Sequence, residues 1–317
     1  MRVLRLLAVS ILLIQSAFAG ESSGFPDQVT GFRDLLWNGS SMAIKAERAR
    51  ITAWLADKRI VFISGMMDDV IPGVFQDNMA VLRKDFGFQS ITLIKPLSSH
   101  TVAENALELA PQIDQLARKN PTQKLILIAA SKGGAETILM LLENPTWLAS
   151  GKIHRVVGIQ PAVNGTPLAD IATAKCTDDH DSLICQLFAD SPYAREGLAS
   201  LKTDRVAQEI QPRLARLSDD ERSSFTHRLF YVRASQRSLF RVSLEFQIPW
   251  LLNLDHGGEN DGMLLTAQEK LPNLGTDLGV LQSDHAGLFG APAFSNESYA
   301  FRQGFMWALL ERLIQSE

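Results

Sequence analysis

The sequence predicts an α/β protein with a mainly parallel sheet covered by helices on both faces. Short apolar, β-branched runs alternate with longer segments in which apolar residues return at helical spacing. The clearest pair is residues 124–142, where a strand buried on both faces leads through a serine and two glycines into a helix. Such alternation favours parallel strands joined by crossover helices. The length of 317 residues suits a single domain of this class.

The first 19 residues have the pattern of a signal peptide. Two arginines precede an apolar run at residues 6–14, and the segment ends in Ala-Phe-Ala. The run is too short to span a bilayer comfortably, and Ala-x-Ala is a signal-peptidase pattern. We therefore expect residues 1–19 to be removed and residues 20–317 to form one exported domain, periplasmic or secreted. An uncleaved signal anchor is the alternative interpretation.

The predicted strands and helices follow one another in order along the mature chain. Strands are short and apolar, whereas helices carry one apolar face. Strands are expected at residues 59–65, 89–95, 125–129, 154–159, 228–234 and 274–281, and glycines make the last of these the weakest. Helices are expected at residues 41–57, 77–86, 101–119, 135–142 and 295–314. This order is the one that builds a parallel sheet.

Residues 166–226 break the alternation. They hold an apolar patch, a run at helical spacing and both cysteines of the chain, Cys176 and Cys185. An even pair of cysteines so close in sequence predicts one local disulfide in an exported protein. Two thiols and the nearby His180 do not complete a four-ligand site, so we expect neither a metal nor a cofactor. The disulfide would stabilise the chain by about 2–3 kcal/mol.

The turn around Ser131 is the segment that indicates chemistry. Ala129-Ala130-Ser131-Lys132-Gly133-Gly134 joins the strongest predicted strand to its helix. A sharp strand-to-helix turn that exposes a serine needs small residues two positions before and two after it. Gly133 meets this requirement, and Ala129 replaces the usual first glycine. The segment resembles the Ser-Lys-Gly-Gly elbow of lipase-like α/β-hydrolases, although an ordinary turn containing a serine is the plainer interpretation.

This resemblance implies an α/β-hydrolase fold, and it covers most of residues 59–288. In that family an insertion at residues 166–226 lies over the active site as a cap. Its inner face would then contact substrate, and the cap would give transient contact with a membrane surface. An extra helical pair packed on itself is the alternative for this insertion.

The same resemblance indicates the base. A serine hydroxyl needs an imidazole to take its proton and a carboxylate to orient that imidazole. His285 lies in Ser-Asp-His-Ala-Gly-Leu just after the last predicted strand, which resembles the histidine segment of secreted lipases. His256 is the competitor, but no predicted strand leads directly to it.

Asp261 is the predicted acid. It lies in Asn-Asp-Gly-Met-Leu, which resembles the acid segment of lipase-like hydrolases and gives the chain order serine, acid, histidine. Asp255 and Glu259 compete with it, and Asn-Asp-Gly is also a common turn sequence. Asp284 is a weaker candidate, because the side chain of an adjacent residue points away from the imidazole ring.

Two backbone N–H groups are expected to form the oxyanion hole. One belongs to Lys132, the residue after the nucleophile and the first of a helix whose dipole favours negative charge. The resemblance implies that the other comes from the loop after the first strand, where Ser64-Gly65-Met66-Met67 replaces the family's His-Gly-x and lacks its histidine. Met66 is the candidate there, with Met67 as the fallback. The two methionines could equally pack under that loop. We expect the Lys132 ammonium to run to solvent, and the alternative is that it raises the local positive potential at the oxyanion.

These residues predict an exported lipase- or esterase-like serine hydrolase acting on a small-molecule or lipid ester through an acyl-enzyme. The alternatives are a non-catalytic envelope binding protein on the same fold and an acyltransferase with the same triad. A net charge of −4 and a pI near 5.9 give no basic footprint, so we expect no nucleic-acid partner.

Overall fold

The computed structural model describes residues 24–66, 68, 73–175, 195–255, 258–290 and 295–317. Within them a six-stranded sheet has the order β2-β1-β3-β4-β5-β6, and each neighbouring pair is parallel. The strands are β1 (Lys58–Ile63), β2 (Ile91–Ile94), β3 (Lys124–Ala130), β4 (Ile153–Ile159), β5 (Leu229–Ser235) and β6 (Thr276–Gln282). The predicted mainly parallel sheet is therefore confirmed.

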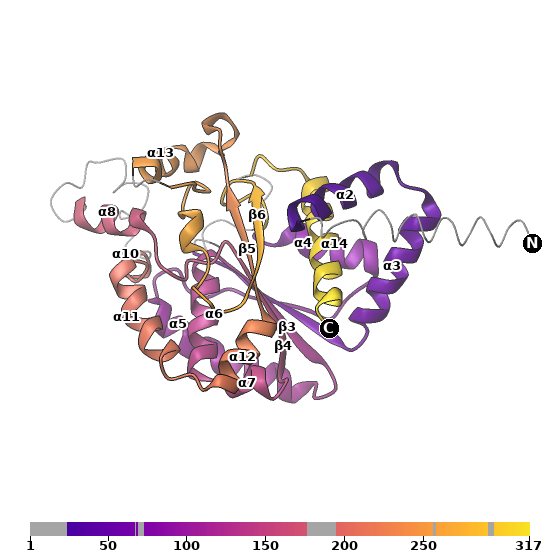
Figure 1. Ribbon diagram of the computed structural model, residues 1–317, viewed down its shortest axis with the longest axis horizontal. Coiled ribbons are helices and arrows are strands. Elements are labelled where there is room, and N and C mark those ends of the chain that lie inside the picture. The colour runs from indigo at the N-terminus through magenta and orange to yellow at the C-terminus, as the bar shows by residue number, and fades with distance from the viewer. Residues whose placement is uncertain (1–23, 67, 69–72, 176–194, 256–257, 291–294) are drawn as a thin grey trace, which may run out of the picture.

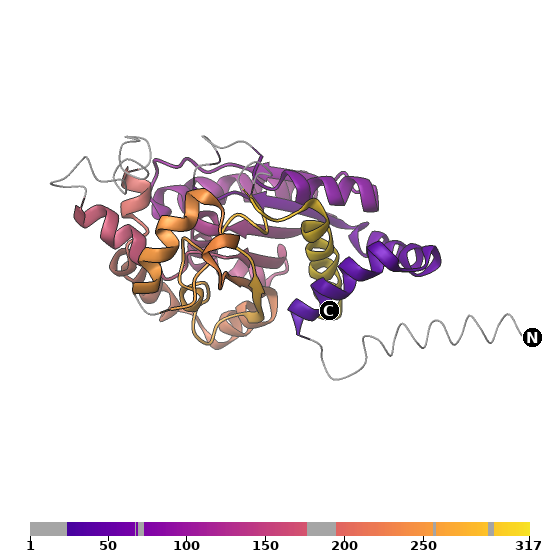
Figure 2. The same ribbon diagram turned by 90° about the horizontal axis from the view of Figure 1, so that it is seen from above.

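Helices cover both faces of this sheet (Figure 1). One layer contains α5 (Val102–Lys119), α6 (Ser131–Glu143), α7 (Thr146–Ala149), α11 (Thr203–Leu214) and α12 (Asp219–Arg228). The other contains α2 (Phe25–Asn38), α3 (Ser41–Leu55), α4 (Gln76–Phe86) and α14 (Tyr299–Gln315). Figure 2 shows the same layers from above, with α14 beside α2. Two hydrophobic cores result, one on each face.

The central strand β3 shows how the sequence builds both cores. Leu125 and Leu127 pack into the α5–α6 layer, whereas Ile126 and Ile128 pack into the layer that contains α14. All four side chains are fully buried. A strand with apolar residues on both faces is therefore the expected centre of a parallel sheet.

Several element boundaries differ from the sequence-based expectation. Helix α2 was not predicted, although Phe25, Val29 and Phe32 recur at helical spacing and are buried. The C-terminal helix begins later than residue 295, because Ser298 caps it by accepting a hydrogen bond from the N–H of Phe301. Strand β5 starts one residue late, since α12 continues through Arg228.

The second half of the insertion 166–226 belongs to the main helical layer. Val206 and Ile210 of α11 and Phe225 of α12 are buried in the core shared with α5 and α6. The remaining described parts are α8 (Pro167–Lys175) and α10 (Arg195–Ala199). Cys176, His180 and Cys185 lie outside the described residues, as do residues 1–19, so the disulfide and the signal peptide remain predictions. Among the described residues, no helix is long and apolar enough to cross a membrane.

Arg302 of α14 ties three elements together. Its side chain is 1% exposed, and its Nε and second terminal nitrogen lie 2.9 and 2.8 Å from one carboxylate oxygen of Asp77 on α4. The other terminal nitrogen donates to the carbonyl of Gly287 at 3.2 Å. Because Gly287 follows His285 closely, this buried pair supports the loop that carries the histidine.

We predict that Arg302→Met lowers the free energy of unfolding by about 3 kcal/mol, because it leaves the Asp77 carboxylate partly buried without its partner. Urea unfolding followed by circular dichroism measures the change. Arg312→Met on the same helix is the matched control, since Arg312 contacts only an exposed glutamine among the described hydrogen bonds. Equal stability of the two variants would contradict the assigned role of Arg302.

Candidate active site

Ser131 sits at a strained junction between β3 and α6. Its φ angle is 53°, in the left-handed region that side chains other than glycine rarely adopt. Two glycines, Gly133 two positions later and Gly65 in the loop after β1, leave room for this geometry. A Cβ atom on Gly133 would lie 2.1 Å from the Ser64 carbonyl oxygen, and one on Gly65 would lie 2.8 Å from the Ser131 Cβ. The loop that follows β1 thus requires a glycine at position 133, two residues after the serine.

Three predicted residues, Ser131, His285 and Asp261, form a continuous series of hydrogen bonds. The Nε2 atom of His285 lies 2.9 Å from the Ser131 Oγ, and its Nδ1 lies 2.6 Å from the Asp261 Oδ2. Ser131 follows β3, and His285 comes shortly after β6, so both residues leave the sheet at the carboxyl edge of its parallel strands, and the loop after β6 reaches past β5 and β4 to the serine. The backbone N–H of His285 also donates to the Asp261 carbonyl at 2.8 Å. The two loops are therefore joined twice.

The Asp261 carboxylate is fully buried, and each of its two oxygens accepts two hydrogen bonds. Its Oδ1 accepts the backbone N–H groups of Met263 and Leu264 at 2.8 and 2.7 Å. Its Oδ2 accepts from His285 and from the Gln160 side chain, the latter at 2.7 Å. A buried carboxylate is stable only when such donors replace water. The Asn-Asp-Gly-Met-Leu turn supplies two of them itself.

None of the competing acids forms a described hydrogen bond with the His285 ring. Asp255 and Glu259 are exposed, and Glu259 forms an ion pair with Arg237 at 3.5 Å. Asp284 is buried but accepts from the backbone N–H and the hydroxyl of Ser243, at 2.8 and 2.5 Å. Burial raises the pKa of this Asp284 carboxyl. His256 and Met67 lie outside the described residues.

The two expected oxyanion donors come from the segments that meet at Ser131. Lys132 is the second residue of α6, and Met66 follows Gly65, whose Cα faces Ser131. The Met66 side chain is half-buried against the hydrophobic core, so packing and donation by its backbone are compatible. Both amides thus belong to segments that adjoin the serine.

The expectation for the Lys132 side chain is wrong. It is 1% exposed, and its ammonium lies 2.7 Å from Glu136 and donates to the His100 carbonyl at 2.6 Å. Asn105 also donates to Glu136, at 2.6 Å. Burial raises the pKa of Glu136, and the Lys132 charge opposes that rise. The lysine runs inward because Glu136 lies one helical turn away and offers an opposite charge.

Apolar residues surround the histidine. The rings of Phe246 and Phe289 meet the His285 ring edge-on, with centroids 6.0 and 5.5 Å apart. Phe246 belongs to a segment that contains η1 (Leu239–Arg241), η2 (Leu244–Phe246) and α13 (Gln247–Asp255). Five of its large apolar side chains are exposed: Phe240, Leu244, Ile248, Leu251 and Leu254. An apolar surface therefore adjoins the histidine loop.

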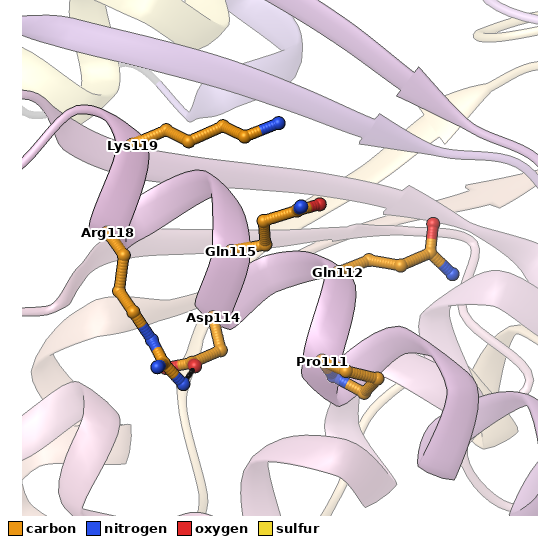
Figure 3. A pocket seen from close by; sticks show the side chains of 6 residues that line it. All are labelled: Pro111, Gln112, Asp114, Gln115, Arg118 and Lys119. Carbon is orange, nitrogen blue, oxygen red and sulfur yellow. Dashed lines mark ion pairs between the residues drawn. The ribbon is translucent and has the colours of Figure 1, made fainter.

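A surface hollow elsewhere is not part of this site. Figure 3 shows it along α5, lined by Pro111, Gln112, Asp114, Gln115, Arg118 and Lys119. Asp114 forms ion pairs with Arg118 and with Lys152 there. No residue of the serine, histidine and aspartate group lines it. Among the described residues, no group of three or more histidine, cysteine, aspartate or glutamate residues could hold a metal ion.

Comparison with known proteins agrees with this architecture. No family model and no curated protein matches the sequence. A solved structure of the metagenomic carboxyl esterase MGS0156 is similar, with a TM-score of 0.61, 20% identity and coverage of 83% of this chain and 77% of that one. The mature form of Bacillus licheniformis lipase BlEst2 has a TM-score of 0.56, 20% identity and coverage of 73% and 85%.

The chain therefore has the α/β-hydrolase fold, as the sequence predicted. Its similar structures include an esterase and a lipase. On this fold, the side chains of Ser131, His285 and Asp261 are hydrogen-bonded in series.

Sequence reasoning missed one neighbour of the site and one buried acid. Gln160, directly after β4, donates to Asp261. Glu269 is fully buried, and its Oε2 accepts from the Ala234 backbone N–H at 2.9 Å, whereas its Oε1 has no partner among the described residues. Burial raises the pKa of Glu269 well above the ordinary 4.5, and the negative charge of Asp261 adds to the rise.

We predict that Glu269→Gln stabilises the protein increasingly as pH rises. Above 4.5 the unfolded chain loses the glutamate proton while the folded chain keeps it, so the stability of the wild type falls with pH. The neutral amide has no proton to lose. Urea unfolding at about pH 5 and about pH 8 should show the larger gain at the higher value. The exposed Glu196→Gln is the control, and a pH-independent difference for Glu269→Gln would refute the explanation.

Proposed function

We propose that the chain is an exported serine hydrolase that cleaves carboxylic esters through an acyl-enzyme. The observation that carries this proposal is the continuous chain of hydrogen bonds from the Ser131 Oγ through both nitrogens of His285 to the Asp261 Oδ2. These three groups supply a nucleophile, a base that takes its proton and a carboxylate that fixes the tautomer of that base.

In the first half of the reaction, the Ser131 Oγ attacks the ester carbonyl carbon while His285 Nε2 takes the hydroxyl proton. The C=O bond becomes a C–O⁻ bond, and the oxyanion accepts hydrogen bonds from the backbone N–H groups of Lys132 and Met66. Each well-placed donor contributes about 3 kcal/mol to transition-state stabilisation. His285 then returns its proton to the leaving alkoxide as the ester C–O bond breaks, which releases the alcohol.

In the second half, water replaces the alcohol. His285 takes a proton from water, whose oxygen attacks the acyl carbon, and the bond to Ser131 Oγ breaks as the proton returns to it. Asp261 stays ionised throughout and stabilises the imidazolium that forms in each half. The product is the carboxylic acid, and the free enzyme is regenerated.

The preference for esters has two supports. The similar solved structures include an esterase and a lipase by their printed names. The exposed apolar residues Phe240, Leu244 and Ile248 belong to the same segment of the chain as Phe246, whose ring meets the His285 ring edge-on. Such a surface suits an ester with an apolar acyl chain and transient contact with a membrane surface.

We predict that Ser131→Ala reduces kcat/KM for p-nitrophenyl esters by at least about 1000-fold, since catalysis without the nucleophile falls to what binding and the oxyanion hole supply. A spectrophotometric assay over a ladder of acyl chain lengths measures this. Ser150→Ala is the matched control, because Ser150 lies on the surface. Undiminished turnover in Ser131→Ala would defeat the assignment.

Two outcomes separate the alternatives. A wild-type protein that turns over no ester at any chain length would favour a binding protein on this fold. Formation of a new ester when an alcohol acceptor is supplied, in preference to free acid, would favour an acyltransferase.

Export is the second part of the proposal and rests on residues 1–19, which the structure does not describe. Expression of the full chain in a bacterium should give a protein whose intact mass corresponds to a start at Gly20, found outside the cytoplasm. Retention of residues 1–19 on the membrane-bound protein would instead support the uncleaved anchor.

A further inference from the structure

We propose that Gln160 is the positioning residue of the catalytic acid and fixes the direction in which Asp261 faces His285. The inference rests on the proposed function, because it assigns a role within the same site. Gln160 forms no described hydrogen bond with Ser131 or with the His285 ring. It acts through Asp261.

The amide of Gln160 joins the two loops that meet at the histidine. Its Nε2 donates to the Asp261 Oδ2 at 2.7 Å and to the Asp284 carbonyl at 3.2 Å. The same Oδ2 accepts from His285 Nδ1 at 2.6 Å. Both hydrogens of one NH₂ group are therefore used, one on the acid and one on the residue before the histidine.

The orientation of this amide follows from its neighbours. A carboxylate oxygen and a carbonyl oxygen are both acceptors, so only the NH₂ end can face them. The opposite atom, Oε1, is buried and has no partner among the described residues. The Gln160 side chain is fully buried and its acceptor is unsatisfied, so its two donated hydrogen bonds are the polar contacts that fix its orientation.

The backbone at Gln160 is fixed by strain and close packing. Its φ angle is 45°, in the left-handed region, and its N–H donates to the Val232 carbonyl at 2.7 Å. Pro161 follows, and a Cβ on Gly134 or Gly158 would lie only 2.4 or 2.8 Å from the proline ring. Strained backbone of this kind persists only where the surroundings enforce it. The rigid backbone at this position thus directs the Gln160 side chain at Asp261.

Position 160 faces buried carboxyls, so a neutral hydrogen-bond donor suits it better than a charged group. Asp261, Asp284 and Glu269 are all buried carboxyls near this point. Burial raises the pKa values of Asp284 and Glu269, and the Asp261 charge adds to each rise. A cation would compete with the imidazolium for Asp261, whereas an anion would repel the carboxylate. An amide satisfies the second lone pair of Oδ2 and leaves the charge for His285.

Three variants test the proposal by kcat/KM for an ester across pH and by thermal unfolding. Gln160→Met keeps the unbranched shape and removes both donors. Gln160→Glu can donate only while protonated. Gln28→Met replaces another buried glutamine, on α2, and controls for the loss of a buried amide away from the site.

We expect Gln160→Met to fold and to lose about 100-fold in kcat/KM, the cost of a misplaced catalytic group, by the same factor at every pH. For Gln160→Glu, the ratio of its kcat/KM to that of the wild type should fall as pH rises, because the ionised glutamate repels Asp261. A purely structural role would lower stability without producing this pH-dependent ratio. The Gln28→Met variant should keep wild-type kcat/KM.

A kcat/KM within about twofold of the wild type for Gln160→Met, or a ratio for Gln160→Glu that does not change with pH, would overturn the proposal. The proton resonance of the His285 Nδ1–H gives a readout that needs no substrate. It should shift or broaden in Gln160→Met and stay unchanged in Gln28→Met. If the wild type turns over no ester, the proposed function fails, and this resonance alone decides whether Gln160 positions Asp261.

Discussion

The close approach of two backbone segments at Ser131 is the constraint on which the site depends. The loop after β1 passes so near the start of α6 that Gly133 has no room for a Cβ against the Ser64 carbonyl. That contact fixes the left-handed turn at Ser131 and brings the Met66 and Lys132 segments to the same serine. Steric packing of the backbone, rather than any single polar contact, therefore sets the position of the nucleophile.

The buried carboxyls around the site differ in the hydrogen-bond donors and charges that they face. Asp261 receives donors from His285, Gln160 and two backbone amides. Glu136 receives a lysine and an asparagine on the other side of the serine. Glu269 has one donor, and its raised pKa keeps it protonated where an ordinary glutamate would ionise. Burial raises the pKa of a carboxyl, and hydrogen-bond donors and positive charges oppose that rise.

The sequence predicted the fold and the meeting of Ser131, Asp261 and His285, because Ser131 and His285 closely follow strands and Asp261 lies in a short recognisable segment between the last two strands. It did not predict Gln160, since glutamine before proline has no chemical signature, although its position directly after a strand was a usable signal. The inward Lys132 was also predictable from Glu136 at helical spacing. Helix α12 escaped notice, as Phe225 is its one buried residue. In α13 the apolar residues Ile248, Leu251 and Leu254 are exposed, whereas an amphipathic helix ordinarily buries its apolar residues.

The central claim is that Ser131 is the nucleophile, and covalent labelling tests it most directly. The native protein is treated with a fluorophosphonate, digested with trypsin and analysed by mass spectrometry. Trypsin releases residues 125–132, in which Ser131 is the single serine. The account predicts one phosphonyl adduct on this peptide, lost in His285→Ala. An unlabelled peptide from folded protein, or equal labelling of many serines, would contradict it.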